Sequence, residues 1–155
     1  DAYSREDSEI IENIRNINAI PLSIDDSLKV EVELEGVLYT PFSNSKISIE
    51  QLLSNSFSKI DNSTSILFKA FQIFCSKSDE LSDLTQLQNW GFEVPITLRT
   101  DDPRQVKRWH SQWIKNELFS NLPTNGIVAK CNSSLTKNFL GVSPSSPNWA
   151  LALTR

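Results

Sequence analysis

The residues able to carry acid–base chemistry are few in this chain of 155 residues. His110 is the one histidine, and it is therefore the one candidate for a histidine general base. No glycine-flanked serine of the kind found in serine hydrolases accompanies it. On a helical wheel, His110 falls inside the apolar arc of its segment. We therefore expect a packed, hydrogen-bonded histidine rather than a catalytic one.

The two cysteines, Cys75 and Cys131, allow one redox alternative. Cys75 begins a Cys-x-x-Ser pattern, similar to that of monothiol glutaredoxins, between an apolar segment and a predicted helix, where a reactive thiolate would be favoured. No proline follows Cys75 and no Gly-Gly pair follows the later strand, as that family's pattern would require. A thiol-dependent oxidoreductase centred on Cys75 is the third functional hypothesis. Free buried thiols are the simpler interpretation, and a single disulfide stays open.

Metal and phosphate-loop sites are not indicated by the sequence. One histidine and two distant cysteines do not supply the usual zinc ligands. The pairs Asp25–Asp26 and Asp101–Asp102 sit where a turn or a helix cap accounts for them. The glycines are at least 15 residues apart, which excludes a glycine-rich phosphate loop. We therefore expect no metal, no cofactor, no catalytic residue and a protein that is not an enzyme.

A basic and aromatic segment, residues 100–119, is the remaining candidate site. On the wheel its tryptophans, Trp109 and Trp113, lie opposite most of its cations. Proteins that bind single strands instead place aromatic platforms among their cations. The segment therefore predicts a helix that buries its tryptophans and exposes its cations to water or to a partner. We call these cations the basic face: Arg104, Lys107, Arg108 and Lys115.

Charge and composition bound the functional class. The net charge is −4, with sixteen acidic and seven basic residues (−9) over residues 1–98 and three acidic and eight basic (+5) over residues 99–155. A hydrophobic content of 39% and a charged content of 22% are typical of a folded domain. No segment reaches the length of a membrane-spanning helix, and methionine is absent. We expect an intracellular domain, cytoplasmic or nuclear, excised from a larger protein.

Apolar periodicity predicts the elements that position these residues. Helices are expected over 4–20, 48–60, 78–91 and 102–119. Strands are expected over 28–34, 65–75, 92–98, 127–131 and 149–154. Residues 37–39 are a candidate second strand after Gly36, so this region is expected to hold one or two strands. The order of these elements favours an α/β or α+β fold, a single layered domain over residues 1–155. It would pack about four helices on a mixed sheet of about five to six strands.

The function predicted from these patterns is a non-enzymatic protein-interaction domain. It would serve as a subunit or adaptor of an intracellular assembly and bind a protein through the basic face, with an acidic segment as the candidate partner. The alternative is a nucleic-acid-associated domain that uses the same face, because Lys and Arg also neutralise phosphates. The sequence does not indicate an oligomeric state.

Overall fold

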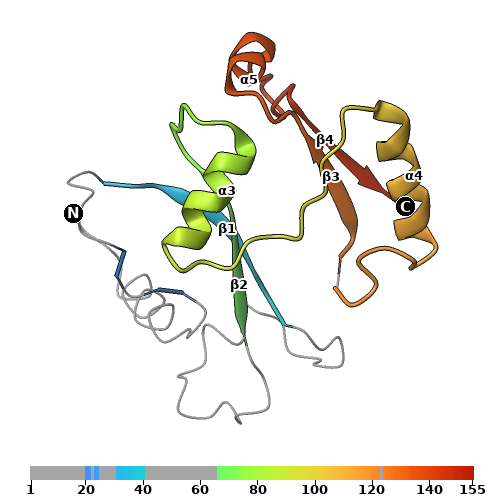
Figure 1. The fold of residues 1–155 in the computed structure, drawn as a ribbon, viewed down its shortest axis with the longest axis horizontal. Helices are drawn as coiled ribbons and strands as arrows, with labels where there is room; N and C mark the ends of the chain where they lie inside the picture. The colour runs from blue at the N-terminus through green and yellow to red at the C-terminus, as the bar shows by residue number, and fades with distance from the viewer. Residues whose placement is uncertain (1–19, 22, 25–30, 41–65, 123) are drawn as a thin grey trace. The chain divides into compact units, whose positions relative to one another are not determined.

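The computed structural model describes residues 20, 21, 23, 24, 31–40, 66–122 and 124–155 (Figure 1). The chain divides into two compact units. Unit 1 comprises the described residues within Asp1–Phe74 and Leu84–Pro95, and unit 2 comprises those within Cys75–Asp83 and Ile96–Arg155. The helix expected over 48–60 and nearly all of the one expected over 4–20 lie outside the described residues. That one domain covers residues 1–155 stays a prediction.

Strands β1, Leu34–Tyr39, and β2, Leu67–Ile73, form an antiparallel pair in unit 1. β1 is continuous through Gly36, with a register irregularity between Glu35 and Gly36. Of the one or two strands expected here, one strand therefore covers Leu34–Tyr39. A Cβ at Gly36 would lie 2.6 Å from the backbone oxygen of Lys69 and would overlap the ring of Phe68. Glycine is therefore needed here for the close approach of the two strands.

The core of unit 1 forms where β2 meets the end of helix α3, Glu80–Asn89. Its buried side chains are Ile66, Ala70, Leu84, Leu87 and Phe92. The Phe68 and Phe92 rings meet edge to face, with centroids 6.1 Å apart. Helix α3 confirms the prediction over 78–91, and it is followed by Gly91 with a φ of 88°. A left-handed residue directly after a helix favours glycine.

The strand predicted over 92–98 is absent. One backbone hydrogen bond, from Ala70 N to Glu93 O at 2.9 Å, joins this segment to β2. Pro95 has no N–H and cannot continue the ladder, and Ile96 and Leu98 are exposed. Alternating apolar residues therefore lie here in an extended segment without strand pairing.

Unit 2 contains α4, Pro103–Ile114, β3, Gly126–Lys130, α5, Ser134–Leu140, and β4, Ala150–Thr154. β3 and β4 pair antiparallel, with Gly126 opposite Thr154 and Lys130 opposite Ala150, so the strands expected over 127–131 and 149–154 are confirmed (Figure 1). α5 was not predicted, although its signals are in the sequence. Ser133 caps it by accepting from Thr136 N, and Gly141 follows its last residue.

The predicted fold class is wrong for the described part of the chain. That part has three helices and two separate two-stranded antiparallel sheets, rather than four helices on one mixed sheet of five to six strands. Period-2 patterns identify individual strands, but they do not say which strands pair. No helix in the described ranges is both long and apolar enough to cross a membrane.

We predict that Leu87→Ala lowers the free energy of unfolding by about 2–5 kcal/mol, because it removes a fully buried side chain and leaves a cavity. The matched control is Leu135→Ala on α5. Leu135 is 80% exposed, so this change should stay within about 0.5 kcal/mol. Urea unfolding measures both, and equal losses would contradict the assigned core.

Candidate functional site

The basic face lies on α4, as predicted, and the start of this helix is built as expected. Asp102 is the N-cap, with an extended backbone, and its Oδ1 accepts a hydrogen bond from Arg104 N at 2.9 Å. Pro103 occupies the first turn, where its missing N–H costs nothing. The helix ends at Ile114, earlier than predicted, and Asn116 then takes a left-handed φ of 58°.

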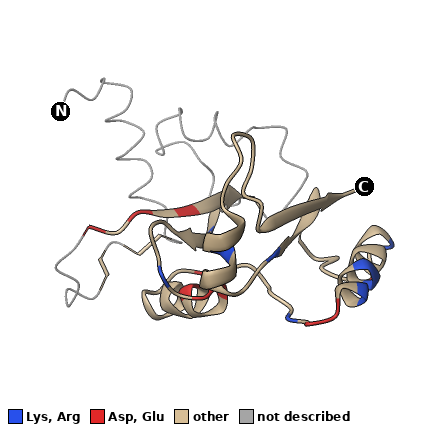
Figure 2. Ribbon diagram, turned by 90° about the horizontal axis from the view of Figure 1, so that it is seen from above, with Lys and Arg blue, Asp and Glu red and all other residues tan. Residues whose placement is uncertain are grey.

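All four cations of the basic face are exposed: Arg104, Lys107, Arg108 and Lys115. Figure 2 colours the Lys and Arg positions of α4 blue on the ribbon. The Arg104 Nε lies 3.3 Å from Asp102 Oδ1, so this guanidinium is partly neutralised. Within the described ranges, no carboxylate forms an ion pair with the other three cations. The available positive charge therefore lies on the middle and the C-terminal end of α4.

The opposite side of α4 is held within unit 2 by its aromatic residues. Trp113 is buried, and its Nε1 donates to Thr124 Oγ1 at 2.9 Å. The His110 Nε2 lies 2.9 Å from the Thr154 carbonyl oxygen, and the His110 ring stacks on Trp113 with centroids 5.9 Å apart. The expectation of a packed, hydrogen-bonded histidine is confirmed. Ile114, in contrast, is 44% exposed and contributes less to packing than expected.

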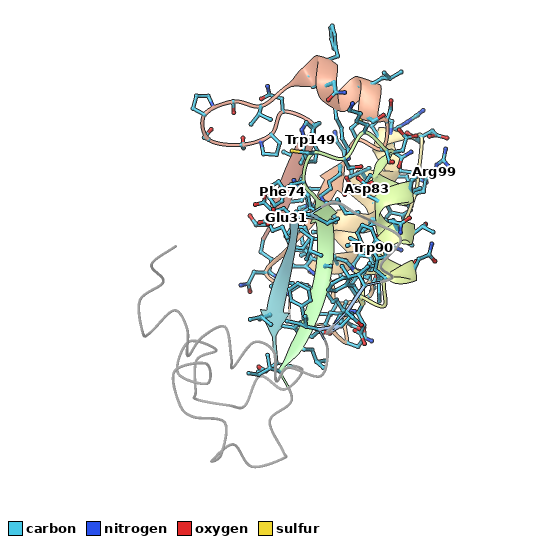
Figure 3. All side chains as sticks on the ribbon, turned by 90° about the vertical axis from the view of Figure 1, so that its left-hand side faces the viewer. Glu31, Phe74, Asp83, Trp90, Arg99 and Trp149 are labelled. Atoms are coloured by element: carbon cyan, nitrogen blue, oxygen red, sulfur yellow. The ribbon has the colours of Figure 1, made fainter. Side chains whose placement is uncertain are left out.

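A second charged cluster in unit 2 was missed by sequence reasoning. The Glu80 carboxylate forms ion pairs with Lys130 and Lys137: Oε1 lies 2.6 Å from Lys130 Nζ, and Oε2 contacts Lys137 Nζ. The Lys137 Nζ also lies 4.9 Å from the centroid of the Trp149 ring, which is labelled in Figure 3. We call these four residues the Glu80 cluster. Its three charged side chains are at most 20% exposed and together carry a formal charge of +1.

The Glu80 cluster ties distant parts of the chain together. Glu80 begins α3, Lys130 ends β3, and Lys137 lies in α5. Backbone contacts reinforce it: Glu80 N donates to Asn132 O at 2.9 Å, and Ser134 N donates to Asp79 Oδ1 at 2.8 Å. No sequence pattern could have indicated this site, because its members are brought together only by folding.

The remaining candidate residues do not form a catalytic or metal site in the described ranges. Cys75 is exposed in the turn after β2, with a φ of 57°, and α3 begins only at Glu80. It does not occupy the helix N-terminus that the redox hypothesis requires. Asp102 serves as a cap, whereas Asp25–Asp26 lies outside the described residues. No three His, Cys, Asp or Glu side chains gather to hold a metal among those described.

Known proteins similar to this chain are DNA ligases. The matches include the DNA ligase of Cytophaga hutchinsonii, 23% identical over 93% of this chain and 25% of the ligase. The DNA ligase of Prochlorococcus marinus is 25% identical over 94% of this chain and 26% of the ligase. That of Ehrlichia chaffeensis is 34% identical over 50% of this chain and 11% of the ligase. The chain spans about a quarter of the first two relatives, and no protein-family model matches it.

These relatives overturn the prediction of a non-enzymatic adaptor or complex subunit. Similarity to DNA ligases over nearly the whole chain points to a nucleic-acid-modifying enzyme. The prediction inferred the absence of an enzyme from the absence of a familiar motif. Active-site residues, however, come together in space and need no fixed sequence pattern. The relatives favour the alternative of a nucleic-acid-associated protein. They do not support the hypothesis of a thiol-dependent oxidoreductase.

We predict that Glu80→Gln lowers the free energy of unfolding by about 3 kcal/mol, because Lys130 and Lys137 would remain as neighbouring, largely buried ammonium groups. Adding Lys137→Met should recover part of this loss, since it removes one uncompensated charge. The control Glu117→Gln, at an exposed position, should change it by less than about 0.5 kcal/mol. Strictly additive losses in the double variant would show that the cluster is not coupled.

Proposed function

We propose that this chain forms part of a DNA-joining enzyme. The observation that carries the proposal is the similarity to DNA ligases along 93–94% of the chain. A quarter of such an enzyme is long enough to be a folded part of it, and the buried core of unit 1 supports a folded state. The natural protein would act on DNA inside the cell, where its substrate is found.

We also propose that the basic face provides contacts to DNA phosphates. Lys107, Arg108 and Lys115 are exposed and have no ion-pair partner among the described residues. Phosphate contacts of this kind give affinity and orientation without specifying a sequence. An acidic protein segment would satisfy the same charges, but the relatives named as DNA ligases favour DNA.

The joining activity is tested on the protein at its full natural length. A duplex with one nick, carrying a 5′-phosphate and a 3′-hydroxyl, is incubated with Mg²⁺ and with ATP or NAD⁺ in separate reactions. We expect conversion of the nicked strand to its full length, measured on a denaturing gel. If the nick stays open under both conditions while a known DNA ligase seals it, the proposed activity is wrong.

The DNA contact is tested with Arg108→Ala. We expect this variant to bind duplex DNA about tenfold more weakly at 50 mM salt, because each phosphate contact releases counterions and contributes on this order. Lys77→Ala is the matched control, since Lys77 is an exposed cation on the turn between β2 and α3. Fluorescence anisotropy measures both affinities, and equal losses would remove α4 from the proposed interface.

A further inference from the structure

We infer that the exposed apolar side of helix α5 binds a second copy of this chain. On α5, Leu135 is 80% exposed and Phe139 is 88% exposed. Side chains four residues apart are neighbours on a helix, so these two form one apolar surface. Val142, which follows Gly141 at the end of the helix, is 73% exposed. We call Leu135, Phe139 and Val142 the α5 patch, and its role is independent of the proposed joining activity.

The α5 patch lies on a helix that is anchored at both ends. In the chain, α5 connects the end of β3 to the start of β4 (Figure 1). At the start of α5, Ser134 N donates to Asp79 Oδ1 at 2.8 Å, and at its end Asn148 Nδ2 donates to Leu140 O at 2.9 Å. The exposure of the patch is therefore not that of a frayed terminus. A surface already held in place loses little conformational freedom when a partner binds.

Residues 131–154, which contain the α5 patch, present no unpaired charge. Lys137 is the one charged residue among them. Its Nζ contacts Glu80 Oε2 and lies 4.9 Å from the centroid of the Trp149 ring, and its side chain is 15% exposed. The charge of α5 is therefore neutralised inside unit 2. An apolar surface without charged residues is typical of the centre of a protein–protein interface.

An uncharged patch suits contact with its own copy. In a two-fold symmetric dimer the same surface of both copies meets, so any unpaired charge on it would face the same charge on the other copy. Like charges brought together in this way oppose association. The basic face of α4 fails this condition, whereas the α5 patch meets it. A different protein that is selected by its charge would find no complementary group on the patch.

The size of the α5 patch sets the strength of the expected dimer. An aromatic side chain such as Phe139 buries about 150–250 Å², whereas a stable interface buries about 800 Å² on each partner. The patch therefore supplies the apolar centre of a small interface, with the exposed polar residues Thr136 and Asn138 beside it. We expect a weak, reversible dimer with an affinity no tighter than the micromolar range.

The oligomeric state of the full-length protein is measured by sedimentation equilibrium from about 1 to about 300 μM, a range that brackets a micromolar dissociation constant. We expect a monomer–dimer equilibrium that does not weaken at high salt, because no exposed charge takes part. Phe139→Ser should raise the dissociation constant at least about tenfold, since central aromatic residues carry much of the binding free energy of an interface.

Ile96→Ser is the matched control for Phe139→Ser. Ile96 is an exposed apolar residue of the same unit, at 54% exposure, and it lies outside α5. This change should leave the dissociation constant of the dimer within about twofold of the original value, as expected for a residue away from an interface. Equal effects of the two variants would contradict the assigned surface.

Thiol labelling shows what covers the α5 patch. Leu135→Cys is made in a Cys75→Ser background, which removes the exposed native thiol, and is reacted with a maleimide in the full-length protein. We expect fast labelling at low protein concentration and slower labelling where the dimer predominates. Lys77→Cys, at an exposed position in the same background, should react at one rate throughout.

Other results would overturn the inference. A monomer at every concentration, or a dimer that Phe139→Ser leaves intact, would contradict it. Protection of Leu135→Cys even in the monomer would mean that another part of the full-length protein covers α5, and fast labelling at all concentrations would leave the patch without a second copy. If the protein seals nicks as a monomer, the enzyme proposal stands and this inference fails. If it dimerises through α5 and seals no nick, the reverse holds.

Discussion

The carboxylate of Glu80 connects the segments of unit 2 that precede and follow β3. Glu80 bonds to Lys130 and Lys137 at once, and the three side chains are largely shielded from water. Two ammonium groups this close and this shielded would repel each other strongly without the shared carboxylate. The ion pairs of Glu80 hold the start of α3 and α5 to the end of β3. The backbone N–H groups of Glu80 and Ser134 can therefore keep their hydrogen bonds to Asn132 and Asp79.

The orientation of α4 follows from a second set of contacts in the same unit. The Trp113–Thr124 hydrogen bond and the contact of His110 with the Thr154 carbonyl oxygen attach one side of the helix to the segment before β3 and to β4. A helix attached along one side presents the other to solvent. Trp113 and His110 therefore determine which way the basic face points, although they contribute no charge to it.

In α4 the packed side chains of Trp113 and His110 lie on one side and the exposed cations on the other, and this separation affects which partners the helix can bind. Rings that pack against their own protein are lost to base stacking, and cations that lack internal carboxylate partners remain free for phosphates. Under the proposed DNA-joining function, these charges would contact DNA phosphates.

The sequence by itself determined the local features of this protein. Asp102 and Pro103 predicted where α4 begins, the wheel predicted that Trp113 is buried while Arg108 is exposed, and short apolar runs predicted β2, β3 and β4. These follow from neighbours within a few residues, for which periodicity and capping chemistry suffice. The segment 92–98 shows the limit, because its alternation was genuine and yet it forms no strand, with one backbone hydrogen bond, from Ala70 N to Glu93 O, linking it to β2.

Only the tertiary structure decided the arrangements that depend on residues far apart in the chain. The pairing of strands into two small sheets joins Lys130 with Ala150 and Leu34 with Ile73, positions that are far beyond the reach of a local pattern. The meeting of Glu80 with Lys130 and Lys137 spans 50 and 57 residues. No local pattern encodes such meetings, because they depend on which surfaces exclude water together when the chain folds. For the same reason, the lack of a familiar motif could not show that the chain lacks an enzyme's site.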